Sequence, residues 1–163
     1  MKYVYLIRHA HAKTFMFQGD HQRPLTERGQ QEAALTAACL SAHLDGRSVL
    51  LCYSDALRTT ETAQIILAHL SSHAVTARAE ASLYNAKEAV LVQTIQNTPS
   101  MYDTLVLIGH NSGISYCAEY VCGLPLPDMS PCAIYGFEYA CSGWDEIAEG
   151  TGRLCLTYAP PAV

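Results

Sequence analysis

The sequence lacks any apolar run that approaches the roughly 20 residues of a membrane-spanning helix. It also lacks a basic cluster, because 10 lysines and arginines face 15 aspartates and glutamates and the formal net charge is −5. Proteins that bind the nucleic-acid backbone usually carry a basic surplus. The opening stretch MKYVYLIRHA is too short for a signal peptide and has no small-residue cleavage site. We therefore expect a cytoplasmic protein that binds neither membranes nor nucleic acids.

The cysteines form no pattern that predicts a disulfide framework. There are seven of them, an odd number, and no C-x-x-C pair. In a reducing compartment most should be thiols used as small apolar residues, and Cys39 and Cys52 lie inside apolar runs as this interpretation requires. Cys117 and Cys122 could in principle bind a metal, but no nearby residue completes a ligand set.

The sequence does contain an alternation of apolar runs and amphipathic segments. Half of its 163 residues are hydrophobic, which is enough for one domain with a substantial core. The apolar runs 3–7, 49–53 and 104–108 predict strands that are buried on both faces of a parallel sheet. Apolar periodicity predicts helices that begin after Thr26, near Ala56, at about 86 and near Ser112. Two further strands are expected within 132–158. The fold class is therefore α/β: a single three-layer α/β/α domain over 1–163 with a mostly parallel sheet.

Polar side chains follow three of the predicted strands at the point where each strand ends. Arg8 and His9 follow the first strand, and Arg58 stands in the helical turn after the second. His110 and Asn111 follow the third. Because ligands of open α/β sheets bind beyond the carboxyl ends of the strands, these side chains should share one pocket. Arginines, histidines and helix N-termini together favour an anion.

A metal site built from His9, His11 and His21 is the main alternative. His9 and His11 would point to opposite sides if the strand continued that far. Arg8, next to His9, would also repel a divalent cation. The residue pattern therefore favours an oxyanion site over a metal site.

Four segments carry a resemblance to a known family: LIRHAHA, RPLTERGQQEA, YSDALRTTETA and VLIGHNSGI. In this order and spacing they resemble the signature segments of the histidine phosphatase superfamily, whose fold is phosphoglycerate-mutase-like. The segments SLYNAKEAVL and GFEYACSGWDEIAEGTGRL, and the short chain without room for a cap insertion, are similar to the SixA-type phosphohistidine phosphatase branch.

The resemblance implies that His9 is the nucleophile and forms a covalent phosphohistidine that water then hydrolyses. Its other ring nitrogen should donate to a backbone carbonyl. Arg8 and Arg58 would clamp the phosphate oxygens, because guanidinium groups pair with phosphate in a bidentate way. His110 would donate to the transition state. No cofactor is implied, because the arginines supply the charge that magnesium supplies elsewhere.

The roles of several neighbouring residues stay open. Arg23 is assigned as a further phosphate ligand, with a surface position as its alternative. Asn111 could donate to phosphate or cap the fourth helix, and Ser54 could touch phosphate or cap the second, of which we favour capping. The side chains expected to be structural, or to form turns and caps, are His11, His21, Asp20 and Asp55.

The leaving group that the site can release determines which class of phosphate compound it can hydrolyse. Superfamily members that act on phosphate esters generally carry an acidic residue that protonates the leaving alkoxide. Here Glu80 and Glu88 are the possible general acids, and neither aligns securely with that acid. A phosphorylated imidazole can take a proton on its free ring nitrogen near neutral pH, so phosphohistidine on a protein is the favoured substrate. The alternatives are a small-molecule phosphomonoesterase and a non-catalytic phosphate-dependent binding module. The partner is thus a phosphorylated protein or a small phosphate compound, and the sequence does not indicate the oligomeric state.

Overall fold

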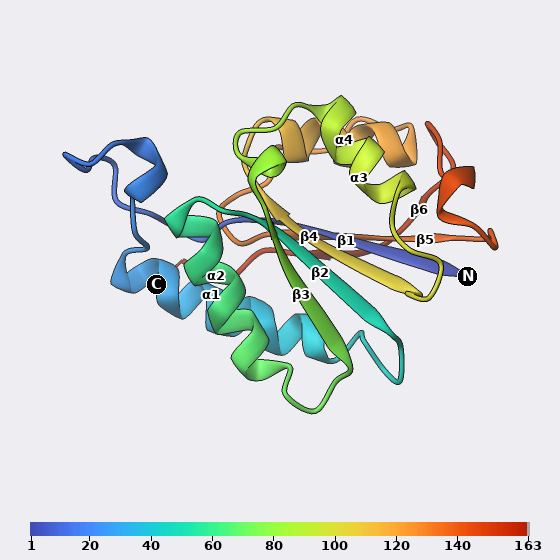
Figure 1. The fold of residues 1–163 in the computed structure, drawn as a ribbon, viewed down its shortest axis with the longest axis horizontal. Coiled ribbons are helices and arrows are strands. Elements are labelled where there is room, and N and C mark those ends of the chain that lie inside the picture. Colours follow the sequence, from blue (N-terminus) through green and yellow to red (C-terminus); the bar gives the residue numbers. More distant parts are fainter. Residues whose placement is uncertain (163) are drawn as a thin grey trace.

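The computed structural model describes residues 1–162 and contains one six-stranded sheet with helices on both faces (Figure 1). The strands are β1 (Lys2–Arg8), β2 (Val49–Ser54), β3 (Val75–Glu80), β4 (Thr104–Gly109), β5 (Ile134–Tyr139) and β6 (Arg153–Tyr158). The α-helices are α1 (Glu27–Ser41), α2 (Leu57–His69), α3 (Glu88–Gln96) and α4 (Gly113–Cys122). Three single 3-10 turns complete the list: η1 (Asp20–Gln22), η2 (Ala81–Leu83) and η3 (Trp144–Glu146).

The strand order is β3-β2-β4-β1-β5-β6. The first four strands in this order run parallel, whereas β5 pairs antiparallel with β1, and β6 pairs antiparallel with β5. This arrangement confirms the predicted mostly parallel α/β fold. In the register of β1 and β4, Arg8 lies opposite Gly109. The two strands therefore deliver their next residues, His9 and His110, to the same edge of the sheet.

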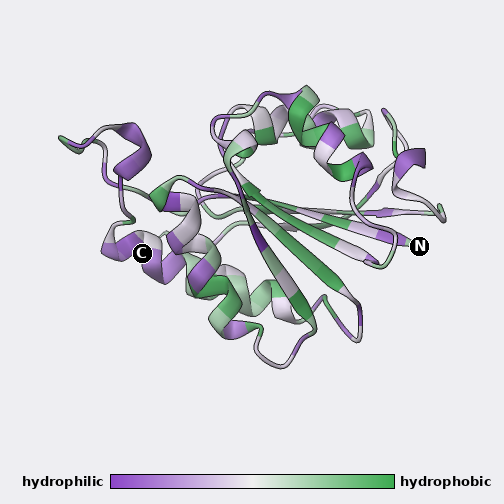
Figure 2. Ribbon diagram, viewed as in Figure 1, coloured by the Kyte–Doolittle hydropathy of each residue, from purple (hydrophilic) through white to green (hydrophobic). Residues whose placement is uncertain are grey.

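The helices α1 and α2 cover one face of the sheet, and α3 and α4 cover the other (Figure 1). Alternate residues of β1 show this division, because Tyr5 and Ile7 pack with α1 and α2, whereas Val4 and Leu6 pack with α3 and α4. The central strands are hydrophobic along most of their length (Figure 2). Burial on both faces explains why the three strands predicted from continuous apolar runs were found where expected.

The start of α1 ties that helix to the end of β1. Thr26 is its N-cap, as predicted, and the Thr26 side chain accepts a hydrogen bond from the Gly29 N–H at 3.1 Å. The Thr26 N–H donates to the carbonyl of His11 at 3.0 Å. A Cβ on residue 29 would lie 2.0 Å from that carbonyl oxygen, so only glycine permits this approach. The residues after β1 are thereby held against α1.

The strand β3 was not predicted. It is an edge strand whose residues VTARAE are half-exposed or exposed, so it carries no apolar run. The two C-terminal strands lie within the predicted range, and all seven cysteines are free thiols, as expected. None of the helices in the described part of the chain has the length and apolar character needed to span a bilayer.

Candidate active site

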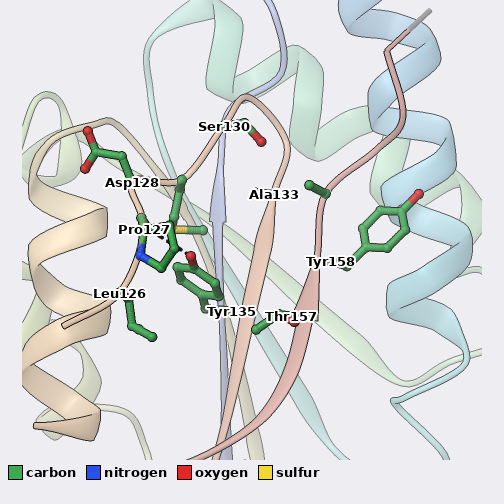
Figure 3. Close-up of a pocket in the computed structure, with 10 residues that line it drawn as sticks. Leu126, Pro127, Asp128, Ser130, Ala133, Tyr135, Thr157 and Tyr158 are labelled. Atoms are coloured by element: carbon green, nitrogen blue, oxygen red, sulfur yellow. Dashed lines mark hydrogen bonds between the residues drawn. The ribbon is translucent and has the colours of Figure 1, made fainter. Parts of the chain in front are cut away.

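The carboxyl ends of β1, β2 and β4 border a polar cavity of about 300 Å³. Eleven residues line it: Arg8, His9, His11, Ala12, Asp20, Arg23, Arg58, Asn85, His110, Asn111 and Pro131. The structure thus brings together the two arginines and two histidines that end three separate segments. A further cavity of about 390 Å³ lies between the 126–130 segment and strands β5 and β6 (Figure 3). Asp128 is the charged residue among its described lining residues, and it holds no histidine or arginine, so the polar cavity is the candidate site.

His9 is oriented as a nucleophile requires. Its Nδ1–H donates to the Ala10 carbonyl at 2.8 Å, which is the kind of backbone partner predicted. The proton is therefore on Nδ1, and Nε2 keeps its lone pair. Burial and the nearby guanidinium of Arg58 lower the pKa of His9 to about 4. The imidazole is neutral at pH 7 and can attack phosphorus.

The backbone that follows His9 is also fixed. The Ala10 N–H donates to the Thr62 hydroxyl at 3.1 Å, and that hydroxyl donates to the Arg58 carbonyl at 2.7 Å. This chain of hydrogen bonds links the end of β1 to the first two turns of α2. It sets the position of His9 relative to Arg58.

Arg58 is 2% exposed although it carries a full charge. Its Nη1 donates to the Asp20 carbonyl at 2.8 Å, and its Nη2 donates to the Asp20 carboxylate at 3.1 Å. Its Nε is buried and has no hydrogen-bond partner among residues 1–162. Buried donors normally have partners. This donor is therefore one that an anion in the cavity could satisfy.

Arg8 likewise combines a fixed nitrogen with a free one. Its Nη1 donates to the Met129 carbonyl at 2.9 Å, whereas its Nε is buried without a partner in the described part of the chain. Met129 is buried in the core and lines the other cavity, between the 126–130 segment and strands β5 and β6. Arg23 is held differently, by donating to the Asp20 carboxylate at 2.9 Å and to the Lys13 carbonyl at 2.8 Å. Three guanidinium groups therefore surround His9 from different segments.

His110 lines the cavity beside His9 as a neutral imidazole. Its ring centroid lies 5.4 Å from that of His9, and its Nε2 is hydrogen-bonded to the Ser54 hydroxyl at 2.8 Å. Burial and Arg58 lower the pKa of His110 to about 3. Its Nδ1 is buried and has no partner within residues 1–162. In the tautomer with the proton on Nδ1, His110 can donate to a bound oxyanion.

Part of this site lies in a segment of the sequence that matches the model of a known family. The model of the histidine phosphatase superfamily, branch 1, matches residues 4–84, a range that includes His9, Arg23 and Arg58. The chain belongs to the histidine phosphatase superfamily. A curated relative, the uncharacterized protein Rv1276c of Mycobacterium tuberculosis, is 29% identical over 92% of this chain and 98% of its own length.

Solved structures show the same fold for this histidine phosphatase. The SixA protein of Agrobacterium tumefaciens is 22% identical with a TM-score of 0.81, and 98% of each chain is covered. A protein histidine phosphatase SixA complexed with tungstate is 21% identical with a TM-score of 0.77 over 97% of each chain. A mycobacterial glucosyl-3-phosphoglycerate phosphatase is 15% identical with a TM-score of 0.70 over 99% of this chain and 100% of its own. The chain therefore shares the fold of these phosphatases.

Asp20 is a pocket residue that sequence reasoning missed. We expected a turn or cap carboxylate, but its side chain lines the cavity and binds Arg23 and Arg58. The Tyr84 hydroxyl also donates to it. This hydrogen bond, together with Arg58 and Arg23, lowers the pKa of Asp20 to about 2. Asp20 therefore stays ionised in the pocket of this histidine phosphatase at neutral pH.

Other residues also differ from expectation. Ser54 accepts the Ala56 N–H at 3.3 Å just before α2, but Ala56 itself is the N-cap, and the stronger contact of Ser54 is with His110. Asp55 pairs with His21 at 2.9 Å instead of capping a helix. His11 lines the cavity, where its Nδ1 lies 2.7 Å from the Thr26 hydroxyl oxygen.

Asn111 lines the cavity at the end of β4. Its Oδ1 accepts a hydrogen bond from the Ser115 hydroxyl at 2.5 Å, and Ser112, the next residue, is the N-cap of α4. The side-chain oxygen of Asn111 therefore faces α4, which leaves the amide nitrogen as the group that could reach phosphate. Asn85, which lies between the two candidate acids in the sequence, is also a lining residue.

The possible general acids require a correction. Glu80 lies at the end of β3, 3.8 Å from Arg78, and borders a different cavity under α3. Glu88 begins α3 and faces the groove between α3 and α4. Neither side chain lines the polar cavity, because β3 and α3 direct them to other surfaces. The structure therefore supports neither residue as an acid at this site.

The rival metal site has no structural basis in the described residues. No group of three or more His, Cys, Asp or Glu side chains within residues 1–162 is placed to hold a metal ion. His11 and His21 have separate partners, Thr26 and Asp55. The cavity instead offers buried guanidinium and imidazole donors, which suit phosphate.

Proposed function

We propose that this histidine phosphatase hydrolyses phosphohistidine carried on a protein, through a covalent phosphate bond to His9. The proposal treats 1–163 as a single histidine phosphatase domain. It needs no cofactor, because the positive charge comes from arginine side chains.

The first chemical step is an in-line displacement at phosphorus. His9 Nε2 forms the new P–N bond while the P–N bond of the substrate breaks, and the substrate imidazole leaves as the neutral base after taking a proton on its other ring nitrogen. Arg8 and Arg58 neutralise the equatorial oxygens through donors that include their free Nε–H groups. His110 donates to the same charge as it develops.

The second step regenerates the enzyme. Water attacks the phosphorus of phosphorylated His9, the P–N bond breaks, and inorganic phosphate leaves. The hydrogen bond from Nδ1–H to the Ala10 carbonyl at 2.8 Å keeps the ring in one orientation through both steps. The oxygens again face the same guanidinium groups.

The ionised state of Asp20 is the observation that favours phosphohistidine as the substrate. Among residues 1–162 it is the single carboxylate that lines the cavity, and its pKa of about 2 leaves it without a proton at neutral pH. An alkoxide leaving group needs a proton donor, since its parent alcohol is a very weak acid. A phosphorylated imidazole supplies its own basic site. The pocket therefore favours phosphohistidine over an ester, in keeping with the likeness to SixA structures.

A phosphomonoesterase is the second candidate. One structural neighbour is a mycobacterial glucosyl-3-phosphoglycerate phosphatase, and the imidazole of His11 also lines the cavity. Side-by-side turnover of a phosphohistidine peptide and para-nitrophenyl phosphate separates the two functions. We expect kcat/KM to be at least about a hundredfold higher for the phosphohistidine peptide, which corresponds to a difference of about 2.7 kcal/mol in transition-state binding. Strong turnover of the ester alone would reject the proposal.

A further inference from the structure

The segment 13–24 forms a hairpin that projects from the carboxyl end of the sheet (Figure 1). An isolated antiparallel bridge joins Ala12 to Leu25 at its base, and the Lys13 N–H donates to the Pro24 carbonyl at 2.9 Å. Arg23 donates across the hairpin to the Lys13 carbonyl. The hairpin is therefore held by contacts on both of its arms.

The base of this hairpin belongs to the active-site cavity. Ala12 on one arm, and Asp20 and Arg23 on the other, are lining residues. Asp20 is also bonded to the buried Arg58. The position of the hairpin is thus fixed relative to the site where phosphate is proposed to bind.

The tip of the hairpin exposes two aromatic side chains. Phe15 is 67% exposed and Phe17 is 95% exposed, and their ring centroids lie 5.4 Å apart. The tip is the hydrophobic end of the projecting segment in Figure 2. Phe17 is three residues from Asp20, so the chain places their Cα atoms within roughly 11 Å of each other. The apolar pair therefore lies on the same hairpin as two of the residues that line the cavity, but outside the cavity itself.

Exposed aromatic pairs in this position usually mark an interaction site, because water contact with two phenyl rings is unfavourable. A free small phosphate compound would reach the cavity without touching the tip. A phosphohistidine on a protein would bring its neighbouring residues against it. We propose that Phe15 and Phe17 bind the apolar side chains that flank the phosphohistidine of a protein substrate. This inference rests on the proposed function.

A bilayer is a less suitable occupant for this tip. Membrane-binding segments commonly combine apolar residues with a basic surplus that is attracted to anionic lipids. Here Lys13 and Arg23 are accompanied by Asp20, and the whole chain has a net charge of −5. The charge of the whole chain therefore gives little attraction to anionic lipids, and the location of the aromatic pair on the hairpin that lines the cavity favours a protein substrate.

The test compares full-length wild type with the double variant Phe15→Ser/Phe17→Ser. The probes are free phosphohistidine and two peptides of equal length with a central phosphohistidine, one flanked by leucines and one by serines. We expect the wild-type KM to be about tenfold lower for the leucine-flanked peptide, an effect typical of burying part of an aromatic ring. The double variant should lose this difference while its kcat, and its turnover of free phosphohistidine, stay unchanged.

Met101→Ser is the matched control, because Met101 is 71% exposed and precedes β4 at the opposite end of the sheet. It should keep the wild-type preference. Equal KM values for the two peptides in wild type would overturn the docking proposal while leaving the phosphatase activity intact. Failure of wild type to hydrolyse any phosphohistidine probe would instead overturn the proposed function. Phe-dependent binding to vesicles of phosphatidylcholine and phosphatidylglycerol, without a peptide preference, would assign the tip to membranes and also overturn the docking proposal.

Discussion

The two ends of β1 each carry a cationic side chain, buried at Lys2 and half-buried at Arg8, but the surroundings differ. Lys2 at the start is 5% exposed, and its Nζ donates to the Tyr102 carbonyl at 2.8 Å and the Ser100 carbonyl at 3.3 Å. The Asp103 carboxylate lies 3.7 Å away. An ammonium group has three donors, so the chain itself satisfies Lys2. This end of the strand is built for stability.

At the other end of β1, several side chains are not fully hydrogen-bonded within residues 1–162. Arg8, and the neighbouring Arg58 and His110, each keep a buried nitrogen without a partner among the described residues. Asp20, the one carboxylate that lines the cavity among residues 1–162, is shared between Arg23 and Arg58. Buried donors without partners cost stability. The comparison indicates that a satisfied buried charge supports the fold, whereas an unsatisfied cluster prepares a ligand site.

The largest effect should come from removing a cation at the unsatisfied end. Arg58→Ala should lower kcat/KM for the phosphohistidine peptide by roughly a thousandfold, because a preorganised donor to the developing charge is lost. Arg58→Lys should recover part of this, since it restores charge without the planar fork. Steady-state kinetics of both variants test the effect. Wild-type kinetics in Arg58→Ala would place phosphate elsewhere.

The pH dependence of stability should also arise at the active-site end. The pKa of His9 is about 4 in the folded protein and about 6.5 when unfolded. Between these values only the unfolded chain binds the proton, so the stabilisation present above about pH 6.5 is lost as the pH falls toward 4. Proton uptake by His9 in the unfolded chain should by itself lower the free energy of unfolding by about 2 kcal/mol between about pH 7 and about pH 4.5.

Urea unfolding at the two pH values measures this loss. His9→Asn should show a smaller loss than wild type, and the remainder should include the contribution of His110, whose pKa is lowered to about 3. Lys2→Met is the control from the other end of the strand and should keep the wild-type difference. An identical loss in His9→Asn would show that His9 is not buried in its neutral form.

Lys2→Met should change stability and leave catalysis alone. The substitution removes the donor to the Ser100 carbonyl, while the Tyr102 carbonyl keeps its bond from the Trp144 indole at 3.0 Å. We expect a cost of about 1.5 kcal/mol in unfolding free energy, typical of losing a hydrogen bond from a charged donor. The kcat of the folded variant should equal that of wild type. A fall in kcat beyond about twofold, which is below 0.5 kcal/mol, would break the distinction between the two ends.

The smallest effect should come from Ser54→Ala, which acts through another residue. Ser54 positions His110 through the 2.8 Å bond to its Nε2. Without it, the ring should lose orientation and kcat should fall about tenfold, while KM and the melting temperature change little. A matched fall in stability and activity would instead indicate a purely structural role for Ser54.

The sequence predicts the parts of this molecule that follow from regular structure. Continuous apolar runs located β1, β2 and β4, and parallel pairing then brings their polar ends together. Thus Arg8, His9, Arg58 and His110 could be grouped without coordinates. The edge strand β3 was missed because its residues VTARAE face solvent and lack an apolar pattern.

The contacts of the hairpin could not be read from the sequence. Asp20 follows a glycine in a polar segment, which is typical of a turn. Its actual partners, Arg58 and Tyr84, are 38 and 64 residues away. Likewise Glu80 and Glu88 flank the lining residue Asn85 in the sequence, but the geometry of β3 and α3 directs their side chains to other surfaces. Long-range placement of loop side chains depends on the assembled fold.

The central claim is that His9 carries the phosphoryl group during turnover. Rapid alkaline quenching of the enzyme with a radiolabelled phosphohistidine peptide, followed by acid-lability analysis and peptide mapping, tests it directly. We predict acid-labile, alkali-stable label on His9 in wild type and none in His9→Ala. Label that persists in His9→Ala, or turnover by that variant at the wild-type rate, would contradict the account.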